Sequence, residues 1–332
     1  MKFGVYFMNE RDRIRKERLF DTFKRNFKIT QLYAEYLERY PEVITEEMVN
    51  TLTEDGKITR EEAIVALLSE IFALDFGNAE DRRIIRDYLT KSVRLLNKDR
   101  YVDNPYYKNV NPEPLIDGNW EIRWEEYKPY QAVICDDMII TEDFTEIPPL
   151  GFFTESFRFP AILEGGNEWM TLTPVDLDTC DEAIEMARGR VVTFGLGLGY
   201  YAYMVSEKPE VESVTVVELS REVIELFKKH LLPKMPNADK IKIVNCDAFE
   251  YAEKVMPSEK FDLAFVDTWR DASDGAPMYK KMKALERYSP NTKFLYWIEN
   301  FLISRLRAEA VSELMCDDTK DFEQTIKELT NI

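Results

Sequence analysis

A short apolar segment that runs into three glycines constrains the fold of this chain more than any other feature. Residues 191–194 are two valines, a threonine and a phenylalanine, and Gly195, Gly197 and Gly199 follow directly. The apolar segment predicts a buried strand. The glycines predict a turn whose backbone amides stay open to a ligand, because no Cβ blocks the approach. The sequence therefore predicts a strand that turns sharply into a helix, with a ligand at the turn.

Three predicted strands after this turn each end on or before a carboxylate. The strand 214–218 ends on Glu218, about 20 residues beyond the glycines, where an acidic side chain can bind both hydroxyls of a ribose. The strands 241–244 and 261–266 are followed by Asp247 and Asp267. Ligands of open parallel sheets bind outside the carboxyl ends of the strands. The three carboxylates and the glycine turn are therefore expected to line one crevice.

Residues 190–270 resemble the S-adenosylmethionine-binding core of the class I methyltransferases. The resemblance is carried by the GxGxG turn, by Glu218 and by the Asp-Ala-Phe stretch that begins at Asp247. It implies an α/β fold with a Rossmann-like doubly wound sheet and S-adenosylmethionine as the cofactor. Thr193 departs from it, since this position is usually acidic in such proteins. The residues that the pattern assigns to the cofactor are Gly195, Gly197, Gly199, Tyr200, Glu218, Asp247 and Ala248.

Tyr200 distinguishes this interpretation from a nicotinamide-dinucleotide site. The dinucleotide fingerprint has Gly or Ala at the sixth position of GxGxxG, where helix and strand pack closely. The bulky ring of Tyr200 fits a mononucleoside cofactor better, and Asp247 has no evident role in dinucleotide binding. A dinucleotide is therefore the weaker alternative.

Asp267 and Trp269 are the candidate catalytic residues. Transfer from a sulfonium requires donor and acceptor in line, and it requires removal of a proton when the acceptor is a hydroxyl or an amine. Asp267 ends the strand nearest to the expected methyl group and is the candidate base or acceptor-orienting group, with a helix cap as its alternative role. Trp269, Tyr200 and Tyr201 are candidates for the substrate wall or for cation–π contact with the sulfonium, with ordinary core positions as the alternative.

The order of elements before the glycine turn is similar to that of spermidine synthases, which share the methyltransferase core. A small antiparallel β unit, a hairpin at 165–167 and a helix precede the turn, and the stretch 266–279 resembles their Asp-containing loop. Leu198 and Arg270 stand where those enzymes carry Asp residues, which predicts weak polyamine binding. We therefore expect methyl transfer to a small molecule. Aminopropyl transfer and a non-catalytic nucleoside-binding sensor or scaffold are the alternatives.

The chain is expected to have four parts. They are a helical N-terminal region over 1–115, a small β unit over 116–175, a Rossmann-like S-adenosylmethionine-binding domain over 176–316 and a charged helical tail over 317–332. Apolar residues recur with helical spacing over 13–97, where helices are expected near 61–74 and 80–97. A Pro- and Asn-rich connection, 101–118, follows them.

Two stretches raise the alternative of a bound cation. The stretch 51–62 has the glycine of an EF-hand loop, but Thr51 and Thr53 replace two carboxylate ligands. A helix that begins at Thr59, with a capping box to Glu62, explains it better. Separately, the set Asp267, Glu299 and Asn300 resembles the cation ligands of some metal-dependent O-methyltransferases. We expect no metal at either place.

The net charge and the composition of the chain indicate which kinds of partner it can bind and where it is expected to occur. The 332 residues carry a formal net charge of −18, which argues against nucleic acid or an anionic membrane as the partner. The four cysteines show no CxxC spacing, and the sole histidine, His230, is expected to face solvent. No apolar run approaches the length of a membrane span, and no signal-peptide core is seen, so we expect a soluble, cytoplasmic protein. The expected partner is a small-molecule acceptor, and a homodimer is compatible with the sequence.

Overall fold

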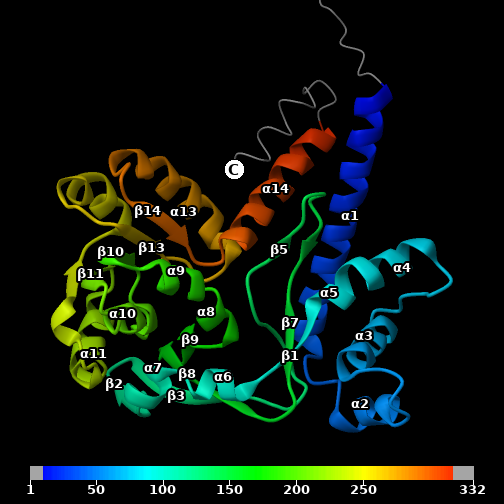
Figure 1. Cartoon of the computed structure of the whole chain (residues 1–332), viewed down its shortest axis with the longest axis horizontal. Coiled ribbons are helices and arrows are strands. Elements are labelled where there is room, and N and C mark those ends of the chain that lie inside the picture. The colour runs from blue at the N-terminus through cyan, green and yellow to red at the C-terminus, as the bar shows by residue number, and fades with distance from the viewer. Residues whose placement is uncertain (1–9, 317–332) are drawn as a thin grey trace, which may run out of the picture. The chain divides into compact units, whose positions relative to one another are not determined.

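The computed structural model describes residues 10–316, which form two compact units (Figure 1). The described residues of one unit are 10–94, 138–150 and 303–316, and the other unit comprises 95–137 and 151–302. The predicted tail, 317–332, lies outside the described residues. The predicted division at 115 and 175 stays a prediction.

The first unit is mainly helical. Its elements are α1 (Glu10–Arg39), α2 (Glu46–Thr53), α3 (Arg60–Ile71), α4 (Ala79–Ile84), a π-helical turn (Ile85–Leu89), α5 (Thr90–Ser92), the short strands β5 (Ile139–Ile140) and β6 (Glu146–Ile147), and most of α14 (Glu299–Cys316). Thr59 caps α3: its hydroxyl accepts from the Glu62 amide at 3.2 Å, and the Glu62 carboxylate accepts from the Thr59 amide at 2.7 Å. The capping-box interpretation of this stretch is confirmed.

The prediction of a helix near 80–97 is wrong for its last residues. The chain leaves the helical conformation at Val93, whose ψ is 128°, and β1 (Val93–Leu96) follows. Three of its four residues, Val93, Leu95 and Leu96, are β-branched or apolar. The strand pairs within a small sheet of order β1-β7-β4, and the boundary between the two units in the sequence falls within β1. The other strands of this sheet are β4 (Ala132–Ile134) and β7 (Leu150–Phe153).

An antiparallel sheet precedes the glycine turn in the second unit, which confirms the predicted β unit and hairpin. Its order is β2-β3-β8-β9, formed by β2 (Leu115–Asp117), β3 (Trp120–Tyr127), β8 (Phe157–Glu164) and β9 (Asn167–Thr171). Gly165 and Gly166 both have positive φ in the turn from β8 to β9. The short helices around this sheet are α6 (Lys98–Val102), α7 (Pro105–Asn109), α8 (Pro174–Asp178) and α9 (Asp181–Met186).

A five-stranded parallel sheet forms the rest of the second unit and confirms the predicted Rossmann-like α/β fold. Its order is β12-β11-β10-β13-β14, with β10 (Gly189–Phe194), β11 (Val211–Glu218), β12 (Ile241–Asn245), β13 (Leu263–Val266) and β14 (Lys293–Tyr296). The connecting helices include α10 (Tyr200–Ser206), α11 (Arg221–His230), α12 (Ala248–Glu250) and α13 (Ala272–Leu285). The chain order reverses at β10, between β11 and β13. Such a switch point is where ligands of doubly wound sheets bind.

Both faces of this sheet are buried, which explains its nearly continuous apolar strands. On one face, Val191 and Val214 pack in the same cluster as side chains of α10 and α11, and the ring of Tyr201 stacks on Phe265 at 4.3 Å. On the other face, Phe194 meets Tyr251 edge-on at 6.1 Å.

His230 is expected from the sequence to face solvent rather than a substrate, and its side chain is 25% exposed. It lies at the end of α11, where the ring is partly buried and its Nε2 lies 3.0 Å from the Oδ2 of Asp117.

Candidate functional site

The glycine turn joins β10 to α10 and brings other parts of the chain very close to its backbone. Gly195 has a φ of +100°, and a Cβ there would lie 1.9 Å from the carbonyl oxygen of Asp267. Gly197 has a φ of +51°, and a Cβ there would lie 2.1 Å from the Sδ of Met170. A side chain at Gly195 is therefore excluded by backbone strain and by contact with backbone. A side chain at Gly197 would be strained and would displace the end of the Met170 side chain.

Glu218 ends β11 directly beside this turn. Its Oε2 accepts from the Leu196 amide at 3.0 Å, and its Oε1 accepts from the Ser220 amide at 2.7 Å. The side chain is buried, and burial raises the pKa of the carboxyl, against the effect of these amide donors. Each carboxylate oxygen can accept a second hydrogen bond, so Glu218 is held in place and can still bind a ligand hydroxyl.

A cavity of about 920 Å³ opens at the carboxyl ends of the parallel strands. Of the sequence-predicted site residues, those that line it are Gly195, Gly197, Glu218, Asp247, Ala248, Asp267 and Trp269. Asp247 also caps α12, since its Oδ1 accepts from the Glu250 amide at 2.9 Å. The sequence therefore predicted one crevice with three carboxylates, and the structure contains it.

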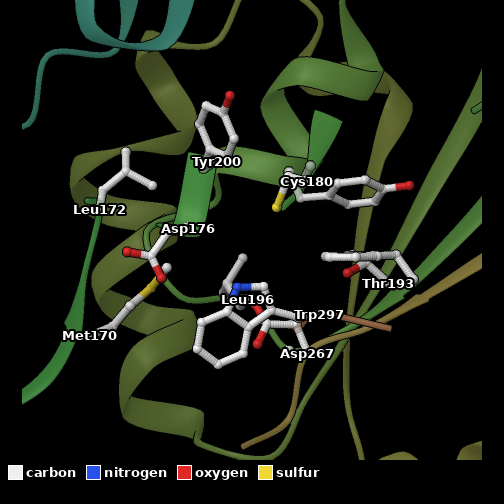
Figure 2. A pocket seen from close by; sticks show the side chains of 13 residues that line it. Met170, Leu172, Asp176, Cys180, Thr193, Leu196, Tyr200, Asp267 and Trp297 are labelled. Atoms are coloured by element: carbon white, nitrogen blue, oxygen red, sulfur yellow. The ribbon is translucent and has the colours of Figure 1, made fainter. Parts of the chain in front are cut away.

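Gly199 and Tyr200 do not line this cavity. A Cβ on Gly199 would lie 2.2 Å from the ring of Phe227, so Gly199 permits α10 to pack against α11. The hydroxyl of Tyr200 accepts from the Nδ2 of Asn104 at 3.0 Å. Tyr200 instead borders a small inner cavity, together with Asp176, Cys180 and Asp267 (Figure 2). The volume of the inner cavity is about 20 Å³, enough for one water-sized group.

Acidic side chains dominate the lining of the larger cavity. They are Glu168, Asp176, Glu218, Glu222, Asp247, Asp267, Asp271 and Asp274, and the only cationic side chain among the lining residues is Arg270. The Arg270 guanidinium is 77% exposed and lies 3.4 Å from a carboxylate oxygen of Asp274. The cavity therefore has a strongly negative field, and its one cation is already paired near solvent.

Two of these carboxyl groups have strongly raised pKa values. Burial raises the pKa of Asp267 to about 8, and the charges of Asp176 and Glu218 add to the shift. Burial raises the pKa of Asp176 to about 6, although hydrogen bonds from Thr173 to its Oδ2 oppose the shift. Such carboxyl groups in one cavity are typical of a site that takes up a proton or a cation.

Trp269 forms a rigid wall of the cavity. Its ring is buried, stacks on Tyr296 at 6.3 Å, and packs so closely on α13 that a Cβ on Gly275 would lie 2.7 Å from it. The indole Nε1 is buried and has no hydrogen-bond partner among the described residues. A buried indole with an unused donor is suited to orienting a ligand or a neighbouring group.

The structure does not bring together the cation ligands considered from the sequence. Glu299 accepts a hydrogen bond from the Tyr279 hydroxyl at 2.7 Å and pairs with Lys283 at 3.3 Å. The backbone amide of Asn300 donates to Asp137 at 2.9 Å. Within residues 10–316, no group of three or more His, Cys, Asp or Glu side chains could hold a metal ion. In the same range, no helix has the length and hydropathy to cross a bilayer.

Several residues of the cavity were not singled out from the sequence, and three of them bear on its chemistry. Asp176 belongs to α8 and forms a capping box with Thr173, so its local pattern indicates only a helix start. Met170 comes from β9 and contacts the glycine turn. Leu219 follows Glu218 and is 69% exposed at the cavity, where a flat apolar ligand would cover it. A buried carboxylate next to an exposed apolar side chain fits the ribose and base of a nucleoside.

The parallel sheet, with carboxylates at the carboxyl ends of its strands, has the architecture of the class I methyltransferase fold. More particularly, residues 162–286 match the family model described as "Spermine/spermidine synthase domain". This match confirms the resemblance predicted from the sequence. No curated protein matches the chain.

Several solved structures are similar to part of the chain. Spermidine synthase from Thermotoga maritima is 16% identical over 46% of this chain and 58% of that chain, with a TM-score of 0.31. Cofactor-bound Rv0187 from MTB is 20% identical over 32% and 48%, with a TM-score of 0.26. A conserved hypothetical protein from Streptococcus pyogenes is 16% identical over 32% and 65%, with a TM-score of 0.26. The chain thus spans less than two thirds of each of these proteins.

Proposed function

We propose that this protein transfers the aminopropyl group of decarboxylated S-adenosylmethionine to a small amine. The observation that carries the proposal is the charge of the cavity, which is lined by eight carboxyl groups and by one guanidinium that is already paired with a carboxylate. Decarboxylated S-adenosylmethionine is a dication without a carboxylate, whereas S-adenosylmethionine brings a carboxylate into this negative field. The field therefore favours the decarboxylated donor and a cationic acceptor. The spermine/spermidine synthase domain match over 162–286 supports the same reaction.

The cofactor-binding roles follow from the positions of the strand ends. Glu218 binds the ribose hydroxyls, and the exposed side chain of Leu219 covers the base. Asp247 and Ala248 lie along the same wall and bind the edge of the base. These contacts fix the nucleoside at one end of the cavity. The sulfonium and its substituents then point toward Asp267.

Asp267 acts as the general base. In the proposed reaction, a neutral amine nitrogen attacks the methylene carbon on sulfur, the C–S bond breaks as the N–C bond forms, and a proton and neutral methylthioadenosine are released. Asp267 accepts that proton. Its pKa is raised to about 8 in the free protein, and the bound cation favours the ionised form, which is the form that can act as the base. The buried ring of Trp269, which forms a wall of the cavity, excludes water from the reacting groups and keeps donor and acceptor in line.

Methyl transfer is the second candidate function, and one specific observation favours it. Leu198 and Arg270 stand where spermidine synthases carry carboxylates. Arg270 repels a bound polyamine less than the sequence suggested, because its guanidinium is exposed and paired with Asp274. Asp176 contributes a carboxylate to the cavity from a different element. The choice between the two reactions therefore depends on the donor that the protein accepts.

An activity assay distinguishes the two reactions. The protein is incubated either with decarboxylated S-adenosylmethionine or with S-adenosylmethionine and, in separate samples for each donor, with a primary diamine, a primary monoamine or a phenol. We expect methylthioadenosine and an N-aminopropyl product with an amine, and no such product with the phenol. Methylated product and S-adenosylhomocysteine from S-adenosylmethionine, without aminopropyl product, would establish methyl transfer instead.

Binding of a sulfonium donor should strengthen as the pH rises. Asp176 and Asp267 have pKa values of about 6 and about 8 in the free protein, so each lacks its negative charge below its pKa. A cation favours the ionised form, so affinity should increase from pH 6 to pH 8.5 and protons should be released on binding. Calorimetry at several pH values, in buffers of different ionisation enthalpy, measures both effects. An affinity that is flat across this range, without proton release, contradicts the electrostatic account.

A further inference from the structure

Met170 occupies a position in the cavity that the proposed reaction does not explain. It belongs to β9 of the antiparallel sheet, yet its side chain reaches the glycine turn between β10 and α10. The Sδ of Met170 accepts from the Leu198 amide at 3.2 Å. Gly197 lacks a Cβ at the point where one would lie 2.1 Å from this sulfur. The thioether therefore fits into a recess of the turn that only glycine leaves open.

Three other amides of the turn already have strong partners within the protein. Gly195 donates to the Val217 carbonyl at 2.9 Å, Leu196 donates to the Glu218 carboxylate at 3.0 Å, and Gly199 donates to the Leu196 carbonyl at 2.8 Å. A thioether sulfur, in contrast, is an uncharged and weak acceptor. A carboxylate would accept from the same amide through a much stronger, charge-assisted hydrogen bond. The Leu198 amide is thus a potential anion donor covered by an apolar group.

In the proposed binding mode, the recess lies on the path of the donor's tail. Glu218 and Leu219 define the nucleoside end of the cavity, and Asp267 lies beside the turn at the other end. Met170 borders both the larger cavity and the inner cavity, and Asp176 and Asp267 line both cavities with it (Figure 2). A substituent on the 5′ side of the ribose therefore passes Met170 before it reaches the inner cavity.

We infer that Met170 is a specificity-determining residue that excludes donors with a carboxylate on the tail. This inference rests on the proposed function and adds a residue that selects the donor. Met170 does so by filling the recess and by covering the Leu198 amide, the donor that would otherwise bind a tail carboxylate. A donor without this carboxylate loses nothing, because it has no group for that amide.

Two substitutions test this role by calorimetric titration of the full chain with S-adenosylmethionine and with its decarboxylated form. Met170→Ala opens the recess and uncovers the amide, so affinity for S-adenosylmethionine should rise about tenfold. Affinity for the decarboxylated form should stay within about threefold, which also shows that the variant is folded. Met170→Leu keeps the apolar volume, so it should retain the discrimination of the wild-type protein.

The outcomes separate this inference from the proposed reaction. If Met170→Ala leaves the ratio of the two affinities unchanged, or weakens both ligands alike, Met170 does not select the donor and the inference is overturned. This holds whichever product the wild-type protein makes. If the ratio changes as expected but no aminopropyl product forms, the inference stands and the proposed transfer fails.

Discussion

Replacing Asp267 with Asn should lower kcat by about 10²- to 10⁴-fold, because an amide cannot accept the proton that the amine loses. Donor affinity should change little near pH 6, where Asp267 is already protonated, and should weaken above pH 8, where the variant lacks the negative charge. The same substitution should stabilise the ligand-free protein at neutral and alkaline pH. The folded-state pKa of Asp267 is raised to about 8, from an ordinary value of 3.8. The folded protein therefore binds a proton that the unfolded chain has lost, and its stability falls as the pH rises from about 4 to about 8.

Thermal unfolding and steady-state kinetics measured side by side check this prediction. Asp267→Asn should raise Tm relative to wild type at pH 8 and much less at pH 5, where Asp267 is already protonated. Asp239→Asn is the matched control, since Asp239 is exposed and does not line the cavity. Full activity of Asp267→Asn would exclude Asp267 as the base. If Asp267→Asn has a lower Tm than wild type at pH 8, the negative charge of Asp267 does not oppose folding.

Replacing Glu218 with Ala should weaken donor binding by about 10²- to 10⁴-fold. Two charge-assisted hydrogen bonds to the ribose hydroxyls are worth roughly 1.5 to 3 kcal/mol each. The substitution also removes the acceptor of the Leu196 and Ser220 amides, so the glycine turn loses its anchor. Calorimetric titration with decarboxylated S-adenosylmethionine measures the loss.

Glu222→Ala separates a specific contact from a change in charge. Glu222 lines the same cavity and is exposed, so its loss removes one negative charge but no predicted contact with the ribose. We expect a change in affinity below about fivefold for this variant, as for a screened surface charge. Equal losses in Glu218→Ala and Glu222→Ala would mean that Glu218 acts only through the field of the cavity.

The sequence was sufficient to predict the parts of the site that come from consecutive strand ends. The apolar run before Gly195 and the carboxylate of Glu218 lie within one β-α-β unit, so a local pattern fixes their relative positions. Asp247 and Asp267 follow the next strands of the same sheet and reach the cavity for the same reason.

The sequence could not predict which residues from outside the parallel sheet reach the cavity. Met170 and Asp176 enter the cavity from β9 and α8, and no local pattern encodes the packing of those elements on the parallel sheet. Gly199 and Tyr200 match the glycine motif but serve the packing of α10 on Phe227 and the contact with Asn104. The residues of a glycine motif can line a ligand site or serve helix packing. The tertiary structure is needed to tell which role each residue has.

The acidic cavity should select a donor without a carboxylate, and a competition experiment tests this selection most directly. The wild-type protein is given equal concentrations of S-adenosylmethionine and its decarboxylated form, with a primary diamine as the acceptor, and the nucleoside products are measured by mass spectrometry. We predict methylthioadenosine in large excess, with an aminopropylated amine in equal amount. S-adenosylhomocysteine as the main nucleoside product, with a methylated amine, would contradict the account.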